Sequence, residues 1–159
     1  MRKENLDNFY DNVFKDERKV LGLCVPVTMI HKQLFHEGSV LLLEKFNLTS
    51  SELDVLAALF FNNKTLTPTD LYESTIFSSG GMTKLLKKLE SKGYVSRSSC
   101  NADKRSKLVH IEPKGEQLVQ EALALIMHKD NEFFSVLNEN EKKVLFKILK
   151  KLLYRVVER

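Results

Sequence analysis

The segment from Ser78 to Ile111 constrains the fold of this chain more than any other. It starts with serines and two glycines and continues as an amphipathic helix, in which apolar residues recur at helical spacing. The apolar positions are Met82, Leu85, Leu86 and Leu89, and the residues on or near the opposite face are Thr83, Lys84, Lys87, Lys88 and Ser91. Gly93 is expected to end this helix, and two short strands are predicted at 94–98 and 107–111, on either side of a basic loop.

Positive charge is concentrated in this segment. Between Lys84 and Lys107 the sequence has eight basic and two acidic residues, whereas the formal net charge of all 159 residues is only +4. A basic helix followed by a basic hairpin has the shape and the charge to enter a groove of DNA while the hairpin contacts its flank. For a helix that stands alone, a merely solvated lysine face is the simpler alternative.

The region before this segment reads as a series of helices. The spacing of apolar residues predicts helices over 6–23 and 27–46, separated by Pro26. A capping-box pattern at 49–52 begins another helix, and the sequence Thr-Pro-Thr-Asp at 67–70 begins a short one. Together with the lysine-rich helix and a brief turn, these predict a helix-turn-helix.

Two further helices are predicted after the hairpin, one from Pro113 to about residue 134 and one that starts at Asn138. The helices at both ends of the chain are more apolar than a small core requires, so we expect them to pair with a second copy. The predicted fold class is mainly α with a small β-hairpin wing (α+β). The chain is expected to form one domain, with dimerisation helices at 1–47 and 113–159 and a winged helix-turn-helix lobe at 48–112.

The sequence gives no sign of export or membrane insertion. Its longest apolar run, 20–30, is interrupted by Gly22, Pro26 and Thr28, and a membrane-spanning helix needs about 20 residues. Two cysteines are too few for a disulfide scaffold. We therefore expect a cytoplasmic protein with no membrane partner.

The order and spacing of four segments resemble the MarR family of bacterial transcriptional regulators. These segments are Leu48–Phe61, Ser78–Arg97, Asp103–Arg105 and Ile111–Gly115. The resemblance implies a homodimeric winged helix-turn-helix protein that binds double-stranded DNA at a palindromic site. Such a protein represses, or less often activates, nearby genes. Many members of the family release DNA when they meet a small phenolic or other aromatic molecule, or an oxidant.

The resemblance also implies roles for individual residues. The residues expected to enter the major groove are Ser79, Gly80, Thr83, Lys84 and Lys87. Arg105 is expected to reach the minor groove, oriented by Asp103. The expected phosphate contacts are Lys88, Arg97, Lys104 and Lys107, together with Thr67 and Thr69 at a helix start. Ser78 is a further candidate for DNA contact, although helix capping is the favoured role for Ser78, Thr67 and Thr49.

Candidate effector residues lie in the N-terminal helices. Cys24 resembles in its placement the peroxide-reactive cysteine of one branch of the family, but the tyrosines usual there are missing, and an inert buried thiol is the favoured interpretation. His31 and Phe35 are candidates to line a ligand crevice between the dimer helices and the DNA-binding lobe, although a place in the core is the favoured interpretation for Phe35. The four histidines and two cysteines form no ligand pattern, so we expect neither a metal nor a cofactor.

Two other classes of function compete with DNA-binding regulation. A winged-helix protein-interaction module would use the lysine-rich helix on an acidic partner, without sequence-specific DNA binding. The paired glycines at the helix start favour DNA, because they permit close approach of the backbone to the duplex. An enzyme with Cys24 or Cys100 as its nucleophile is disfavoured, because no neighbouring histidine, phosphate loop or acidic pair accompanies either thiol.

Overall fold

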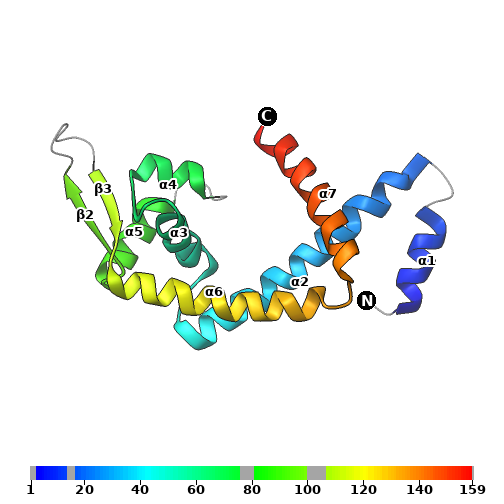
Figure 1. Ribbon diagram of the computed structural model, residues 1–159, viewed down its shortest axis with the longest axis horizontal. Coiled ribbons are helices and arrows are strands. Elements are labelled where there is room, and N and C mark those ends of the chain that lie inside the picture. The colour runs from blue at the N-terminus through cyan, green and yellow to red at the C-terminus, as the bar shows by residue number, and fades with distance from the viewer. Residues whose placement is uncertain (1–2, 14–16, 76–80, 100–106, 159) are drawn as a thin grey trace. The chain divides into compact units, whose positions relative to one another are not determined.

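The computed structural model describes residues 3–13, 17–75, 81–99 and 107–158. In chain order its elements are α1 (Lys3–Val13), the 3-10 helix η1 (Glu17–Val20), α2 (Leu21–Phe46), α3 (Ser50–Phe61), β1 (Thr65–Leu66), α4 (Pro68–Ser74), α5 (Met82–Ser91), β2 (Val95–Ser99), β3 (Lys107–Ile111), α6 (Pro113–Phe134) and α7 (Glu139–Val157) (Figure 1). This mainly helical architecture with one small sheet confirms the predicted fold class. No helix in the described ranges is both long and apolar enough to cross a bilayer.

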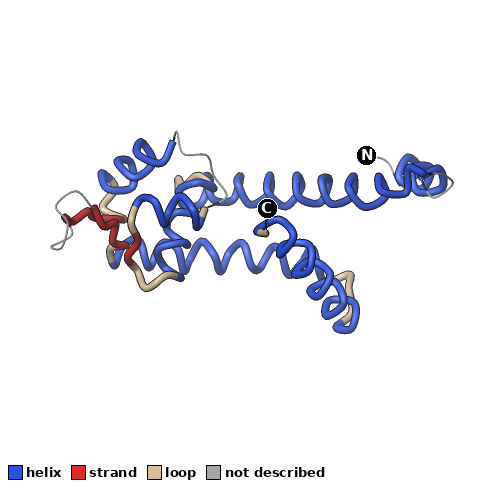
Figure 2. Tube along the Cα trace, turned by 90° about the horizontal axis from the view of Figure 1, so that it is seen from above, coloured by secondary structure: helices blue, strands red, loops and turns tan. Residues whose placement is uncertain are grey.

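The chain divides into two compact units, residues 1–122 and 123–159. Unit 1 contains the helix-turn-helix and the sheet, and unit 2 contains the end of α6 and all of α7. The sheet is antiparallel with the strand order β1-β3-β2, and Figure 2 draws its strands in red. In its register, Arg97 pairs with Val109 and Thr65 pairs with His110. The β2–β3 hairpin matches the predicted wing, whereas the two-residue β1 was not predicted.

Three helices start with the capping boxes that the sequence indicates. Thr49 and Glu52 cap α3, Thr67 and Asp70 cap α4, and Asn138 with its partner Glu141 caps α7. In each box the first side chain accepts the backbone N–H three residues on, and the acid accepts the backbone N–H of the cap residue. These bonds satisfy donors that the start of a helix leaves unpaired, so the sequence fixes where the three helices begin.

The core of unit 1 gathers apolar side chains from α3, α4, α5, the sheet and the first turns of α6. Its fully buried members include Leu56, Leu59, Leu71, Leu89 and Val109. Gly115 brings α6 against the sheet, because a Cβ at this position would lie 2.3 Å from the carbonyl oxygen of Tyr94. The Pro-Lys-Gly start of α6 is therefore a packing requirement as well as a helix signal.

Three helix boundaries differ from the prediction. The first helix, predicted over 6–23, is α1 and ends at Val13. The second, predicted to start at 27, is α2 and starts at Leu21, and Pro26 lies within this helix instead of separating two helices. Since it removes only the one backbone hydrogen bond to Gly22, near the start of a 26-residue helix, the remaining turns continue past it. The lysine-rich helix α5 begins at Met82, with Gly81 as its N-cap and no side-chain cap. The expected caps Ser78 and Ser79 lie outside the described residues.

Candidate nucleic-acid interface

α5 has one buried face and one exposed face. Met82, Leu86 and Leu89 point into the core of unit 1. Thr83, Lys84 and Lys87 are exposed. The helix therefore offers one hydroxyl and two ammonium groups on the side away from the core, as the sequence predicts for a helix that reads a major groove.

A buried carboxylate ties α5 to α3. Glu52 is fully buried, its Oε1 lies 2.8 Å from Nζ of Lys92, and its Oε2 lies 3.2 Å from Nζ of Lys88. Oε2 also accepts the backbone N–H and the hydroxyl of Thr49, each at 2.9 Å. Burial on its own would raise the pKa of Glu52, but the bonds from Lys92, Thr49 and Lys88 outweigh it, and the pKa falls to about 2.

This ion-pair cluster, Glu52 with Lys88 and Lys92, gives Lys88 a structural role. The Lys88 side chain is 51% exposed, so its ammonium group faces solvent as well as Glu52. Lys92 is more covered, and its Nζ also donates to the backbone carbonyl of Asn47 at 3.1 Å. The two lysines hold α5 at the start of α3, and Lys88 alone combines this contact with substantial exposure.

Arg97 is more enclosed than a free phosphate-binding arginine. It lies on β2, its side chain is 19% exposed, and its Nη2 is 2.8 Å from Oε2 of Glu90 on α5. Among the described residues its Nε is buried and has no hydrogen-bond partner. Arg97 thus joins the wing to the lysine-rich helix, and its contact with a phosphate stays a prediction.

His110 joins all three strands of the sheet. Its Nδ1 lies 2.9 Å from the hydroxyl of Thr65 on β1, and its Nε2 lies 2.7 Å from the hydroxyl of Ser98 on β2. These two contacts fix the base of the wing to the segment that leads into α4. Neither contact was foreseen from the sequence.

The remaining predicted contacts divide into two groups. The Thr67 hydroxyl accepts the N–H of Asp70 at 3.1 Å and donates to its carboxylate at 2.8 Å, so its capping role is confirmed, while Thr69 is exposed in the first turn of α4. The backbone of Lys107 begins β3. The other predicted residues lie outside the described residues: Ser78, Ser79, Gly80, Asp103, Lys104 and Arg105.

Comparison with known proteins gives this arrangement a family. The model of the MarR family matches residues 46–106, which run from the end of α2 into the wing. An HTH-type transcriptional regulator of Bacillus cereus is 32% identical over 111 residues, which cover 69% of this chain and 73% of that protein. The chain belongs to the MarR family of transcriptional regulators. This confirms the resemblance seen in the sequence.

Solved structures support the same assignment. The transcriptional regulator BldR from Sulfolobus solfataricus is 27% identical, with a TM-score of 0.74 over 86% of this chain and 96% of that one. A mutant of MarR from E. coli complexed with operator DNA is 25% identical, with a TM-score of 0.67 over 84% of this chain and 97% of that one. The MarR-family relatives are regulators, a class of proteins that acts by binding and not by catalysis.

A second feature of this MarR-family chain is a cavity of about 670 Å³ in unit 1. Its lining comes from α2, α3, the segment after α3 and the end of α4, and comprises His31, Phe35, Asp54, Ala57, Ala58, Phe61, Asn62, Ser74 and Thr75. Two of the predicted effector residues, His31 and Phe35, therefore lie at one cavity, with ring centroids 5.7 Å apart. Asp54 was not predicted, and burial raises its pKa to about 6.

Cys24, the third candidate effector residue, lies elsewhere on α2. Its side chain is exposed, which corrects the expectation of a buried thiol, and it is not part of the cavity lining. The exposed end of α2 near Cys24 is apolar, with Leu21, Leu23 and Val27 all accessible. In the described part of the chain no group of three or more His, Cys, Asp or Glu residues could hold a metal ion.

Proposed function

We propose that this MarR-family regulator is a homodimeric repressor of a palindromic operator. The observation that carries the proposal is the exposed face of Thr83, Lys84 and Lys87 on a helix whose other face is buried and tied down by Glu52. A helix held this rigidly reads bases better than a mobile one, because little order has to be gained on binding. The operator complex of the related MarR supports the same use of the fold.

In this proposal α5 recognises the base sequence, and the wing adds contacts to the minor groove and to phosphates. The start of the helix, from Ser78 through Gly80, brings the backbone near the major groove, and Arg105, oriented by Asp103, enters the minor groove. Lys88, Lys104, Lys107 and Thr69 contact phosphates, which adds affinity but no sequence information.

Apolar surface at both ends of the chain supports pairing. Of the described residues of α7 none is buried, and its large exposed apolar side chains include Phe146, Leu149, Leu152 and Leu153. Exposed apolar surface of this extent is costly in water and is typical of a protein interface. We assign dimerisation to residues 1–47 and 113–159 and DNA binding to 48–112. A dimer sets two recognition helices against two half-sites of a palindrome.

The cavity of His31 and Phe35 supports release by a small molecule, because its volume lies within the range of ligand pockets. It is formed by α2, α3 and α4, so a ligand there touches elements of both the proposed dimerisation region and the DNA-binding lobe. Release by an oxidant would require the exposed Cys24 instead. A repressor of this kind works in the cytoplasm, where the chromosome lies.

The test is a selection of duplexes from a random pool by the purified protein, followed by titration of the enriched duplex. The double variant Lys84→Ala, Lys87→Ala is expected to weaken binding at least about tenfold and to reduce the slope of log K against log salt by about two. The matched control is Lys143→Ala, Lys147→Ala on α7, which removes the same charge from exposed positions in unit 2 and should leave both values unchanged.

A protein-interaction module gives a different outcome. Such a module would enrich no sequence and would bind the selected and the scrambled duplex equally. Equal losses in the α5 variant and the α7 control would show that only the overall charge matters, and would contradict the assignment of α5.

A further inference from the structure

We propose that the effector taken by the His31–Phe35 cavity is a protonated amine carried on an aromatic body. This inference rests on the proposed function for its regulatory meaning, but not for the binding itself. It assigns the effector a positive charge, which the family resemblance, with its phenolic or other aromatic molecules and oxidants, does not specify.

Asp54 is the acid of the cavity lining, and the described residues offer its carboxylate no partner. It is partly buried on α3, and within the described residues no hydrogen bond or ion pair reaches its carboxylate. Two other polar side chains of the lining are already engaged, since Asn62 Nδ2 donates to the carbonyl of Ala58 at 2.8 Å and the Thr75 hydroxyl donates to the carbonyl of Leu71 at 2.8 Å. His31 is the other titratable side chain of the lining, and it makes no ion pair with Asp54.

An unpaired carboxylate at a partly buried site is unfavourable, because its charge has lost water and gained no compensating donor. The raised pKa of Asp54 reflects this cost. A cationic N–H group inside the cavity would remove the cost by a charge-assisted hydrogen bond. A carboxylate or phenolate ligand would increase it, since two like charges would share one partly buried site.

The rest of the cavity wall fits an aromatic body. Phe35 and Phe61 are aromatic residues of the lining, and Ala57 and Ala58 are its small residues near Asp54 on the same helix. The rings of His31 and Phe35, both in the lining, lie next to each other at an interplanar angle of 36°. Flat apolar molecules are well suited to such a wall, and the single acid then orients their charged end.

Three probes that share a ring system test the charge preference: naphthylmethylamine, naphthylmethanol and naphthoate. Each is titrated by calorimetry into the full chain without DNA, at about pH 7.5, above the Asp54 pKa of about 6. The amine is expected to bind at least about tenfold more tightly than naphthoate, with the alcohol between them. Tighter binding of naphthoate, or no binding of the amine, overturns the proposal. The absence of amine binding would also be expected if a second copy of the chain filled the cavity.

Variants locate the binding. Asp54→Asn keeps the size of the side chain and should weaken the amine at least about tenfold while changing the alcohol by less than about twofold. Glu73→Gln, which removes an exposed acid on α4 outside the cavity lining, is the matched control and should change neither probe. Ala57→Leu should weaken all three probes by filling the cavity. Unchanged amine binding in Asp54→Asn places the ligand elsewhere and overturns the proposal.

A separate titration distinguishes this inference from the proposed function. The amine should lower the affinity of the wild-type protein for the selected duplex and leave that of Asp54→Asn unchanged. If the protein selects a duplex but does not bind the amine, only the proposed ligand class is overturned. If the protein binds the amine through Asp54 but selects no duplex, only the proposed function as a DNA-binding regulator is overturned.

Discussion

Glu52 and Asp54 are two residues apart on α3 and have opposite environments. Residues at this spacing point to different sides of a helix, so Glu52 faces α5 and two lysines, whereas Asp54 faces the cavity and no cation. The pKa of the first is lowered to about 2 and that of the second is raised to about 6. The same functional group therefore stabilises the fold at one position and carries a cost at the other.

Replacement of Glu52 by Gln should destabilise the protein by about 2–4 kcal/mol at neutral pH, because two lysines lose their buried counter-charge. The loss is measured by urea denaturation. Because the folded-state pKa lies below the usual value of 4.5, this stabilisation is present above pH 4.5 and disappears as the pH falls toward 2. The control Glu139→Gln removes an exposed pair with Lys142 and should cost less than about 1 kcal/mol.

Replacement of Asp54 by Asn should have the opposite sign. The folded protein binds the Asp54 proton more tightly than the unfolded chain does, so ionisation above pH 6 lowers the stability of the wild-type protein. We expect Asp54→Asn to raise the free energy of unfolding by about 1–3 kcal/mol at neutral pH, with the gain shrinking as the pH falls from 6 toward 3.8. A gain that is independent of pH in thermal denaturation would point to a cause other than this charge.

At the scale of the elements, features that depend on residues close together in the sequence were predicted better than features that depend on contacts between elements. The capping boxes fixed the starts of α3, α4 and α7, because they involve residues three apart in the sequence. The continuation of α2 through Pro26 was not predicted, since the local pattern does not measure how far the other turns of a 26-residue helix offset the hydrogen bond that a proline removes.

The candidate site follows the same division. The amphipathic spacing of α5 correctly predicted that Lys84 and Lys87 are exposed. The partners of Lys88 and Lys92 were missed because Glu52 lies 36 and 40 residues away in the chain, and its capping pattern gave no hint of them. A partly buried acid such as Asp54 has no sequence signal at all beyond an acid within an apolar helix.

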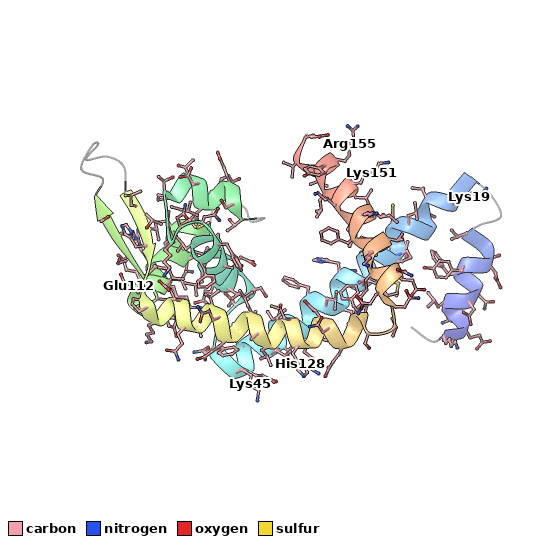
Figure 3. All side chains as sticks on the ribbon, viewed as in Figure 1. Lys19, Lys45, Glu112, His128, Lys151 and Arg155 are labelled. Carbon is pink, nitrogen blue, oxygen red and sulfur yellow. The ribbon has the colours of Figure 1, made fainter. Side chains whose placement is uncertain are left out.

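The proposed role of the wing can be tested at Arg105. Arg105→Ala is expected to weaken binding to the selected duplex by about 1–3 kcal/mol and to leave the melting temperature nearly unchanged, since the proposed role of this arginine is contact with DNA. Arg155, which Figure 3 labels, is an exposed residue of α7. Arg155→Ala removes the same charge in unit 2 and is the control for DNA affinity. Equal affinity of wild type and Arg105→Ala at every salt concentration would refute the wing assignment.

At the scale of the whole molecule, the exposed apolar side chains of α7 determine the expected assembly. Leu149→Glu places a charge among Leu152, Leu153 and other apolar side chains, which should prevent pairing and give a monomer by light scattering. Lys151→Glu changes a charged, exposed residue of the same helix and should remain dimeric. The monomer is also expected to lose most of its affinity for a full palindrome while retaining weak binding to one half-site.

α6 runs without a break from Gly115, packed against the Tyr94 carbonyl in unit 1, to Phe134 in unit 2. The boundary between the two units thus lies within hydrogen-bonded helical backbone and not within a loop. Residues 122 and 123 are neighbours in one helical turn, so any cut of the chain at this boundary breaks backbone hydrogen bonds that span it.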